Sequence, residues 1–85
     1  MSSYRQEQIE ANPGWSDQIK ALVAKGRIVQ GMTRAQVRAS WGPPRDINRS
    51  VGEWGTREQW VYGGLAYSDP RYVYFRDGRC TGWQD

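Results

Sequence analysis

The chain has 85 residues, which suffice for one small domain with a single core and not for two. Hydrophobic residues make up 38% and charged residues 25%, a balance that argues against disorder and is typical of a soluble globular domain. The formal net charge is +3 and is spread along the chain, so charge alone predicts a solvated surface rather than a nucleic-acid partner.

No stretch approaches the roughly 18 apolar residues of a membrane span. The start also lacks the charged segment and apolar segment that are typical of a signal peptide. We therefore expect a cytoplasmic protein if the chain is complete, and a periplasmic or cell-envelope protein if it is a fragment of an exported precursor. The single cysteine, Cys80, lies in a strand-like segment, which predicts a small buried hydrophobe rather than a reactive thiol.

Residues 1–14 are interpreted as a lead-in that is either helical or flexible, because 4–11 contain good helix formers but little apolar face. We assign 15–85 to one α+β domain. Its first helix is predicted to begin after Ser16, a good N-cap, and to end at Lys25-Gly26. The apolar positions that this helix and the following linker are expected to bury are Ile19, Leu22, Val23, Ile28 and Val29.

The clearest signals mark a second, short helix after Thr33. Thr33 is a good N-cap and Gln36 follows three residues later, so the two are predicted to form a capping box. Met32 before the cap and Val37 after it are placed to form a hydrophobic staple. Gly42 suits the left-handed position that ends a helix, and the two prolines after it cannot continue one.

The segments after these prolines predict an antiparallel meander of three to four strands, because aromatic and β-branched residues alternate with turn residues. Asp77-Gly78 is the strongest of the hairpin turn signals. Helices followed by strands indicate an α+β fold in which two N-terminal helices pack on one face of the sheet. The predicted strands are 45–51, 57–62, 71–76 and 79–83, with a loop at 63–70.

The two faces of the predicted strand 71–76 differ. Val73 and Phe75 are assigned to the helix-covered face, and truncating Phe75 or the predicted core residue Trp41 to alanine should cost about 3–5 kcal/mol. Tyr72 and Tyr74 then lie on the open face, where an aromatic surface often marks a binding site. Alternatively, the loop or the N-terminal tail covers these rings. Further aromatic residues that this surface could include are Trp60, Tyr62 and Tyr67.

The order of these signals resembles the SmpA/OmlA (BamE-like) family of outer-membrane assembly lipoprotein domains. The resemblance covers about residues 27–84 and rests on Gly31-Met32-Thr33 with Gln36-Val37, Trp41-Gly42-x-Pro44, Trp60-Val61-Tyr62, and Tyr72-Val73-Tyr74-Phe75 before Asp77-Gly78. It implies two helices on a three- or four-stranded antiparallel sheet, an architecture that is similar to the repeat of proteinaceous β-lactamase inhibitors. It also implies protein–protein contact at the bacterial envelope, with envelope assembly components as partners and no chemistry.

Residue types that carry catalysis are scarce. The chain has no histidine, the commonest general base, and one cysteine cannot build a thiolate metal site. The remaining enzymatic option is a carboxylate set, Asp46, Glu53 and Glu58, which could approach one another across neighbouring strands. Each has an arginine close in sequence, so surface ion pairs are the preferred interpretation. We therefore expect no catalytic, metal or cofactor site.

Two hypotheses of different class follow. The first is a noncatalytic protein-binding or scaffolding module that uses the open sheet face or the loop 63–70. The second is a basic-aromatic domain that binds nucleic acid or anionic lipid, because arginine stacks on aromatic rings and binds phosphates. Arg34 and Arg38 are four residues apart and share a helix face. With Trp54 or Trp60 nearby, the arginines of the middle third that could form this site are Arg34, Arg38, Arg45, Arg49 and Arg57.

Overall fold

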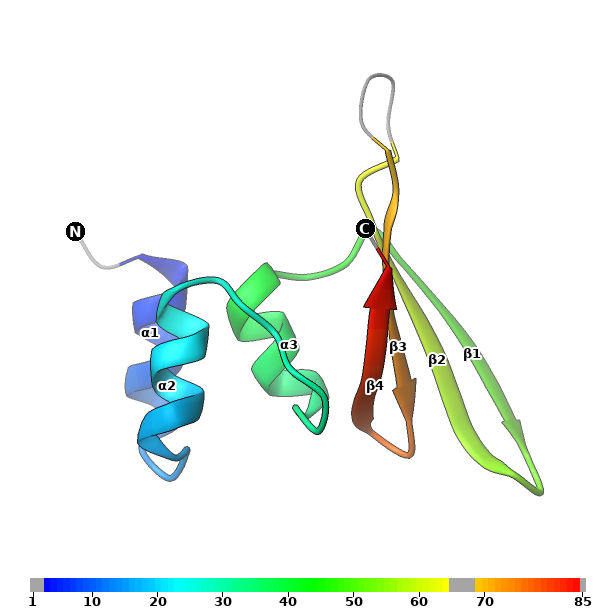
Figure 1. The fold of residues 1–85 in the computed structure, drawn as a ribbon, viewed down its shortest axis with the longest axis horizontal. Coiled ribbons are helices and arrows are strands. Elements are labelled where there is room, and N and C mark those ends of the chain that lie inside the picture. Colours follow the sequence, from blue (N-terminus) through cyan, green and yellow to red (C-terminus); the bar gives the residue numbers. More distant parts are fainter. Residues whose placement is uncertain (1–2, 65–68, 85) are drawn as a thin grey trace.

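The computed structural model describes residues 3–64 and 69–84. Three helices come first and four strands follow (Figure 1), which confirms the α+β fold predicted from the sequence. The helices are α1 (Tyr4–Ala11), α2 (Asp17–Ala24) and α3 (Arg34–Trp41), and the strands are β1 (Asp46–Gly52), β2 (Gly55–Tyr62), β3 (Arg71–Arg76) and β4 (Arg79–Gln84).

The four strands form one antiparallel sheet in the order β1-β2-β3-β4, so the predicted meander is confirmed. The turn between β3 and β4 is Asp77-Gly78, and both residues have positive φ, 50° and 82°, as a two-residue type I′ turn requires. A bulge between Tyr74 and Phe75 interrupts the β3–β4 pairing, and Thr81 is the extra residue of β4.

The helical layer contains three helices rather than the two predicted. α3 lies next to the sheet, and α1 and α2 lie on the side of α3 that faces away from it (Figure 1). α1 packs on both other helices. Arg5 Nε donates a 2.9 Å hydrogen bond to the carbonyl of Ser40, and Ile9 packs against the core. Residues 4–11 are therefore helical, one of the two predicted alternatives, and they contact the rest of the helical layer.

Side-chain caps begin α2 and α3 as predicted. Thr33 Oγ1 accepts from the amide of Gln36 at 3.2 Å, and Gln36 Oε1 accepts from the amide of Thr33 at 3.0 Å, so the capping box is confirmed. Ser16 caps α2 by accepting from the amide of Ile19 at 3.1 Å. α3 ends at Gly42, whose φ of 84° is positive as predicted, while its ψ of 179° is extended rather than helical.

The core lies between α3 and the sheet. Met32 and Val37, the residues of the predicted staple, are both buried there, as are Val73 and Phe75. The prediction that Trp41 is a core residue needs correction. Trp41 is only partly buried, because it lies in the last turn of α3, at the margin of the core. The buried members of the core cluster are Val23, Ile28, Met32, Val37, Ala39, Trp60, Val73, Phe75 and Cys80.

The two edges of the sheet differ. The segment before α3 pairs with β4, since the Gly31 amide donates to the Cys80 carbonyl and the Cys80 amide donates to the Met32 carbonyl, both at 2.8 Å. β1 forms the other edge and lies farthest from the helices (Figure 1), and all of its residues are exposed. Even Ile47 and Val51, which share a face with the core residues of β2, remain exposed.

Candidate functional site

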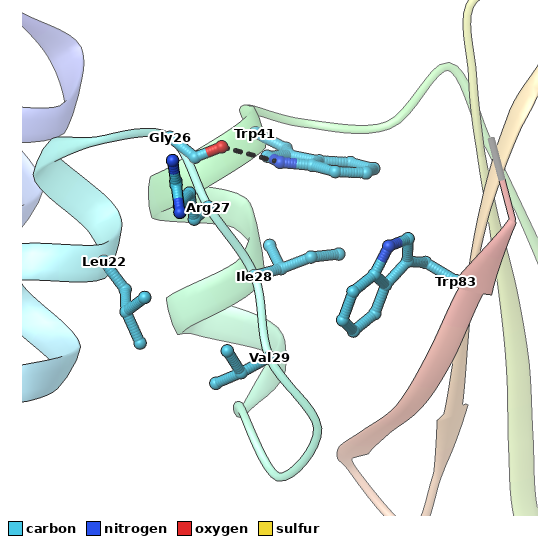
Figure 2. A pocket seen from close by; sticks show the side chains of 7 residues that line it. All are labelled: Leu22, Gly26, Arg27, Ile28, Val29, Trp41 and Trp83. Carbon is cyan, nitrogen blue, oxygen red and sulfur yellow. Dashed lines mark hydrogen bonds between the residues drawn. The ribbon is translucent and has the colours of Figure 1, made fainter.

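A groove lies between the helical layer and β4, where the linker after α2 passes the sheet (Figure 2). Its volume is about 410 Å³. We call it the tryptophan groove, because indole rings from α3 and β4 form two of its walls. The residues that line it are Leu22, Gly26, Arg27, Ile28, Val29, Trp41 and Trp83.

The Trp41 indole is held by three contacts. Its Nε1–H donates a 3.0 Å hydrogen bond to the carbonyl of Gly26 (Figure 2). The ring of Tyr62 meets it edge-on with centroids 5.4 Å apart. The guanidinium carbon of Arg71 lies 3.8 Å from its ring centroid, a cation–π contact. Trp41 is therefore a preformed wall of the groove.

Trp83 points from β4 toward Ile28 and Trp41 across the groove (Figure 2), and the residue remains 41% exposed. It pairs with Val73 in the β3–β4 register, which places it on the helix-facing side of the sheet. The sequence alone places Trp83 only in the last strand, because simple alternation does not reveal the bulge that decides its face. Tryptophan is among the residues most enriched at binding hot spots.

The charge at the groove is positive. Arg27 lines it and is exposed, and no carboxylate is among the described residues that line it. The remaining lining side chains are apolar, apart from the indole N–H groups. The groove can therefore hold an apolar group while favouring a negative charge beside it.

The predicted aromatic surface on the open face is smaller than expected. Trp60 pairs with Val73 and Tyr62 with Arg71, and this register places both rings on the helix-facing side of the sheet. Trp60 is 1% exposed and packs on Phe75. Neither ring can therefore belong to an open-face site. Tyr67, the third additional member of the predicted surface, lies outside the described residues.

Tyr62 has a structural role instead. Its hydroxyl donates a 2.9 Å hydrogen bond to the carbonyl of Gly42, at the end of α3. Burial raises the pKa of this hydroxyl, and the charge of Arg38 partly opposes that effect. Tyr62 thus ties β2 to the end of α3 and remains a neutral donor.

Tyr72 and Tyr74 do lie on the open face, as predicted. Their ring centroids are 6.5 Å apart and their planes are within 25° of parallel. Both are half-buried. Tyr74 donates its hydroxyl to Gln84 Oε1 at 3.2 Å. The open face therefore carries two tyrosines in one fixed arrangement.

Arg34 and Arg38 share a face of α3 as predicted, and that face meets β2. Arg34 forms an ion pair and a hydrogen bond with Glu58. Arg38 lies over the ring of Trp60, with 5.6 Å between its guanidinium carbon and the ring centroid. Both arginines hold α3 on the sheet, so their first role is structural.

Glu58 is the centre of this cluster and is buried. The indole Nε1–H of Trp60 donates to it at 3.1 Å, and Arg49 approaches it to 3.6 Å from β1. Burial works to raise the pKa of Glu58, but the Trp60 hydrogen bond, the contact with Arg34 and the charge of Arg49 outweigh burial and hold that pKa below its usual value. Glu58 is therefore an ionised carboxylate whose partners are within the fold.

The carboxylate set does not assemble. Asp46 pairs with Val61 in the sheet and Glu58 pairs with Arg49, so the two carboxylates lie on opposite faces. Glu53 is in the β1–β2 turn. Asp46 forms the expected surface ion pair, with Arg45 at 3.6 Å, whereas the Glu58 pair is buried rather than on the surface.

The arginines of the middle third do not form one site either. Arg49 and Arg34 bind Glu58, and Arg45 binds Asp46. Arg57 lies on the opposite face from Glu58, where its guanidinium carbon is 5.6 Å from the ring centroid of Trp54.

Cys80 is buried as predicted, and burial raises the pKa of its thiol. Within residues 3–64 and 69–84, no three His, Cys, Asp or Glu side chains are grouped to hold a metal ion.

Comparisons of the chain with protein-family models, with curated proteins and with solved structures gave no match. The SmpA/OmlA resemblance therefore stays a prediction made from the sequence. None of the helices in the described part of the chain has the length and apolar character needed to cross a membrane.

Proposed function

We propose that this chain is a noncatalytic protein-binding module that holds a polypeptide segment in the tryptophan groove. The observation that carries the proposal is Trp83, a residue that is 41% exposed and whose indole faces the fixed ring of Trp41 across an apolar groove. Fully burying a large apolar side chain is worth roughly 1.5–3 kcal/mol, so a partner that covers this indole gains affinity from one contact.

The groove suits a partner segment with one apolar anchor beside acidic residues. Its volume of about 410 Å³ fits a large side chain with its neighbouring backbone. Arg27 gives the rim a positive charge that a carboxylate can complement. Because the Trp41 wall is preformed, that ring loses little conformational entropy on binding.

The wider assignment follows the sequence resemblance. An SmpA/OmlA-like domain acts by protein contact at the bacterial envelope, so we propose a scaffolding role there with envelope assembly components as partners. A role without catalysis is supported by the lack of histidine in the sequence and by the ion pairs that engage Asp46 and Glu58.

Peptide display tests the binding role directly. A random library is selected on the purified chain, and the affinities of the selected peptides are measured for the wild type and for Trp83→Gln. We expect selected peptides to combine an aromatic or aliphatic residue with Asp or Glu, and Trp83→Gln to weaken them about tenfold, a loss of about 1.4 kcal/mol.

Trp54→Gln is the matched control, since Trp54 is 48% exposed but lies in the β1–β2 turn, away from the groove. It should leave these affinities unchanged. Equal losses in the two variants, or a selection that enriches no peptide, would contradict the proposal. The envelope role is tested by affinity capture from an envelope extract, with each variant as bait. A protein that binds the groove should be retained by Trp54→Gln and lost with Trp83→Gln.

A further inference from the structure

The open face of the sheet carries three arginines in one row. The register pairs Arg57 with Arg76 and Arg76 with Arg79, so side chains from β2, β3 and β4 lie side by side on the same face. All three residues are exposed. Like charges directly opposite each other destabilise a sheet, so an anion bound to this arginine row would relieve an unfavourable interaction.

No carboxylate among the described residues forms an ion pair with this row. Asp77, in the adjacent turn, accepts a 2.9 Å hydrogen bond from the amide of Thr56. Arg79 donates from Nη1 to the carbonyl of Gly31 at 3.0 Å. The ion pairs formed between described residues are Arg34–Glu58, Arg45–Asp46 and Arg49–Glu58, and none involves the row.

Aromatic rings flank the row on the same face. The Trp54 ring lies against Gly52 and forms the cation–π contact with Arg57 at one end. Tyr74 and then Tyr72 follow along β3 from Arg76, with the rings 6.5 Å apart and nearly parallel. A depression of about 300 Å³ opens here, lined by Arg57, Tyr74, Arg76 and Thr81. Glu58 and Phe75 also border it, although the register turns their side chains to the buried face.

We propose that this face binds single-stranded nucleic acid, with phosphates on the arginine row and bases stacked on the neighbouring rings. Sequence-tolerant single-strand sites combine these two features: cations that follow the backbone and aromatic rings on which bases stack. An acidic peptide would use the arginines but not the rings, so the presence of both favours nucleic acid. The site is independent of the tryptophan groove, which lies on the helix-facing side of the sheet.

Fluorescence anisotropy with a labelled oligothymidylate of about 12 nucleotides tests the proposal. Each phosphate contact to a single strand contributes roughly −0.7 to the slope of log affinity against log salt concentration. Three arginines that each bind one phosphate therefore predict a slope of about −2. The double variant Arg57→Gln/Arg76→Gln should weaken binding at least tenfold and make that slope about 1.4 shallower. Removing opposed like charges should leave its thermal stability equal to or above that of the wild type.

Lys20→Gln/Lys25→Gln removes the same charge from α2 and its C-terminal cap, outside the row, and should leave the affinity within about twofold. Tyr74→Leu keeps the bulk of the side chain and should weaken binding by at least fivefold through lost stacking. The proposal is overturned by equal losses in the two double variants, by an unchanged affinity in Tyr74→Leu, or by no binding at about 50 mM salt. Tighter binding of a polyglutamate peptide or of anionic vesicles than of the oligonucleotide also overturns it and identifies the occupant.

Discussion

Trp60 on β2 and Phe75 on β3 hold their ring centroids 4.5 Å apart, and both rings are buried between the sheet and the helical layer. Together they supply the aromatic part of the core. Trp41, by contrast, lies at the core margin and lines the tryptophan groove. The fold and the candidate site therefore depend on different aromatic residues, so they can be perturbed separately.

Phe75→Ala should lower the free energy of unfolding by about 3–5 kcal/mol, because it leaves a cavity against Trp60. For a domain this small, a loss of that size removes most of the stability. Trp41→Phe should cost less, about 1 kcal/mol, since it keeps a ring but loses the hydrogen bond to Gly26. Urea denaturation measures both, and a Phe75→Ala variant as stable as the parent would show that the core is placed wrongly.

Glu58 predicts how stability depends on pH. Its pKa in the folded chain is below the ordinary value of 4.5, so folding favours the ionised carboxylate. Its contribution to stability is complete above 4.5 and is lost as pH falls through the lower folded pKa. Glu58→Gln should lower stability at neutral pH by about 1–3 kcal/mol and make the acid limb of the stability curve flatter.

Thermal melts of the parent and of Glu58→Gln, from neutral pH to below 4.5, check that prediction. Glu53→Gln serves as the control because Glu53 is an exposed residue of the β1–β2 turn, and its curve should follow the parent. If Glu58→Gln and the parent lose stability in parallel as pH falls, then Glu58 does not carry the acid sensitivity.

The capping box of α3 is a third test. Thr33→Ala removes the acceptor for the amide of Gln36 and should cost about 1 kcal/mol, whereas Thr33→Ser keeps the hydroxyl and should cost little. Chemical denaturation of the three proteins measures the difference. Equal stability of the alanine and serine variants would mean that the hydroxyl does not act as a cap.

Gly55 provides a test of the turn region. Its φ of 101° is unfavourable for other residues, and a Cβ there would meet the carboxylate of Asp77. Gly55→Ala should therefore destabilise the domain by about 1–3 kcal/mol. Gly14→Ala is the matched control, because a Cβ at Gly14 would have nothing within 4 Å and the φ of Gly14 is not positive. A melting temperature that falls equally in both variants would contradict this account.

Local signals in the sequence predicted the features that depend on neighbouring residues alone. The Thr33-Gln36 capping box, the stop at Gly42 and the Asp77-Gly78 turn need only a few adjacent positions, and the structure contains all three. Alternation within β3 likewise assigned Val73 and Phe75 to the core. Such assignments require no knowledge of a partner strand.

The faces of other residues depend on how strands pair. The face of Trp60 follows from its register with β3, and a shift of one residue would move its whole strand to the other side. The arginine row requires three strands in register, so Arg76 and Arg79 could not be grouped with Arg57 from sequence spacing. The tryptophan groove needs, in addition, the position of the linker after α2.

The bulge in the last hairpin has a consequence for how these surfaces can change. Suppose that Cys80 stayed opposite Phe75 and that the residues after it paired one by one, without a bulge. Trp83 would then lie opposite Tyr72 instead of Val73. The indole would then leave the groove and join the tyrosines on the other side of the sheet. Deleting Thr81, by contrast, would straighten the strand and still keep Trp83 opposite Val73. The bulge thus determines on which face of the sheet Trp83 lies, and a register shift that removes the bulge would move Trp83 to the other face without any substitution.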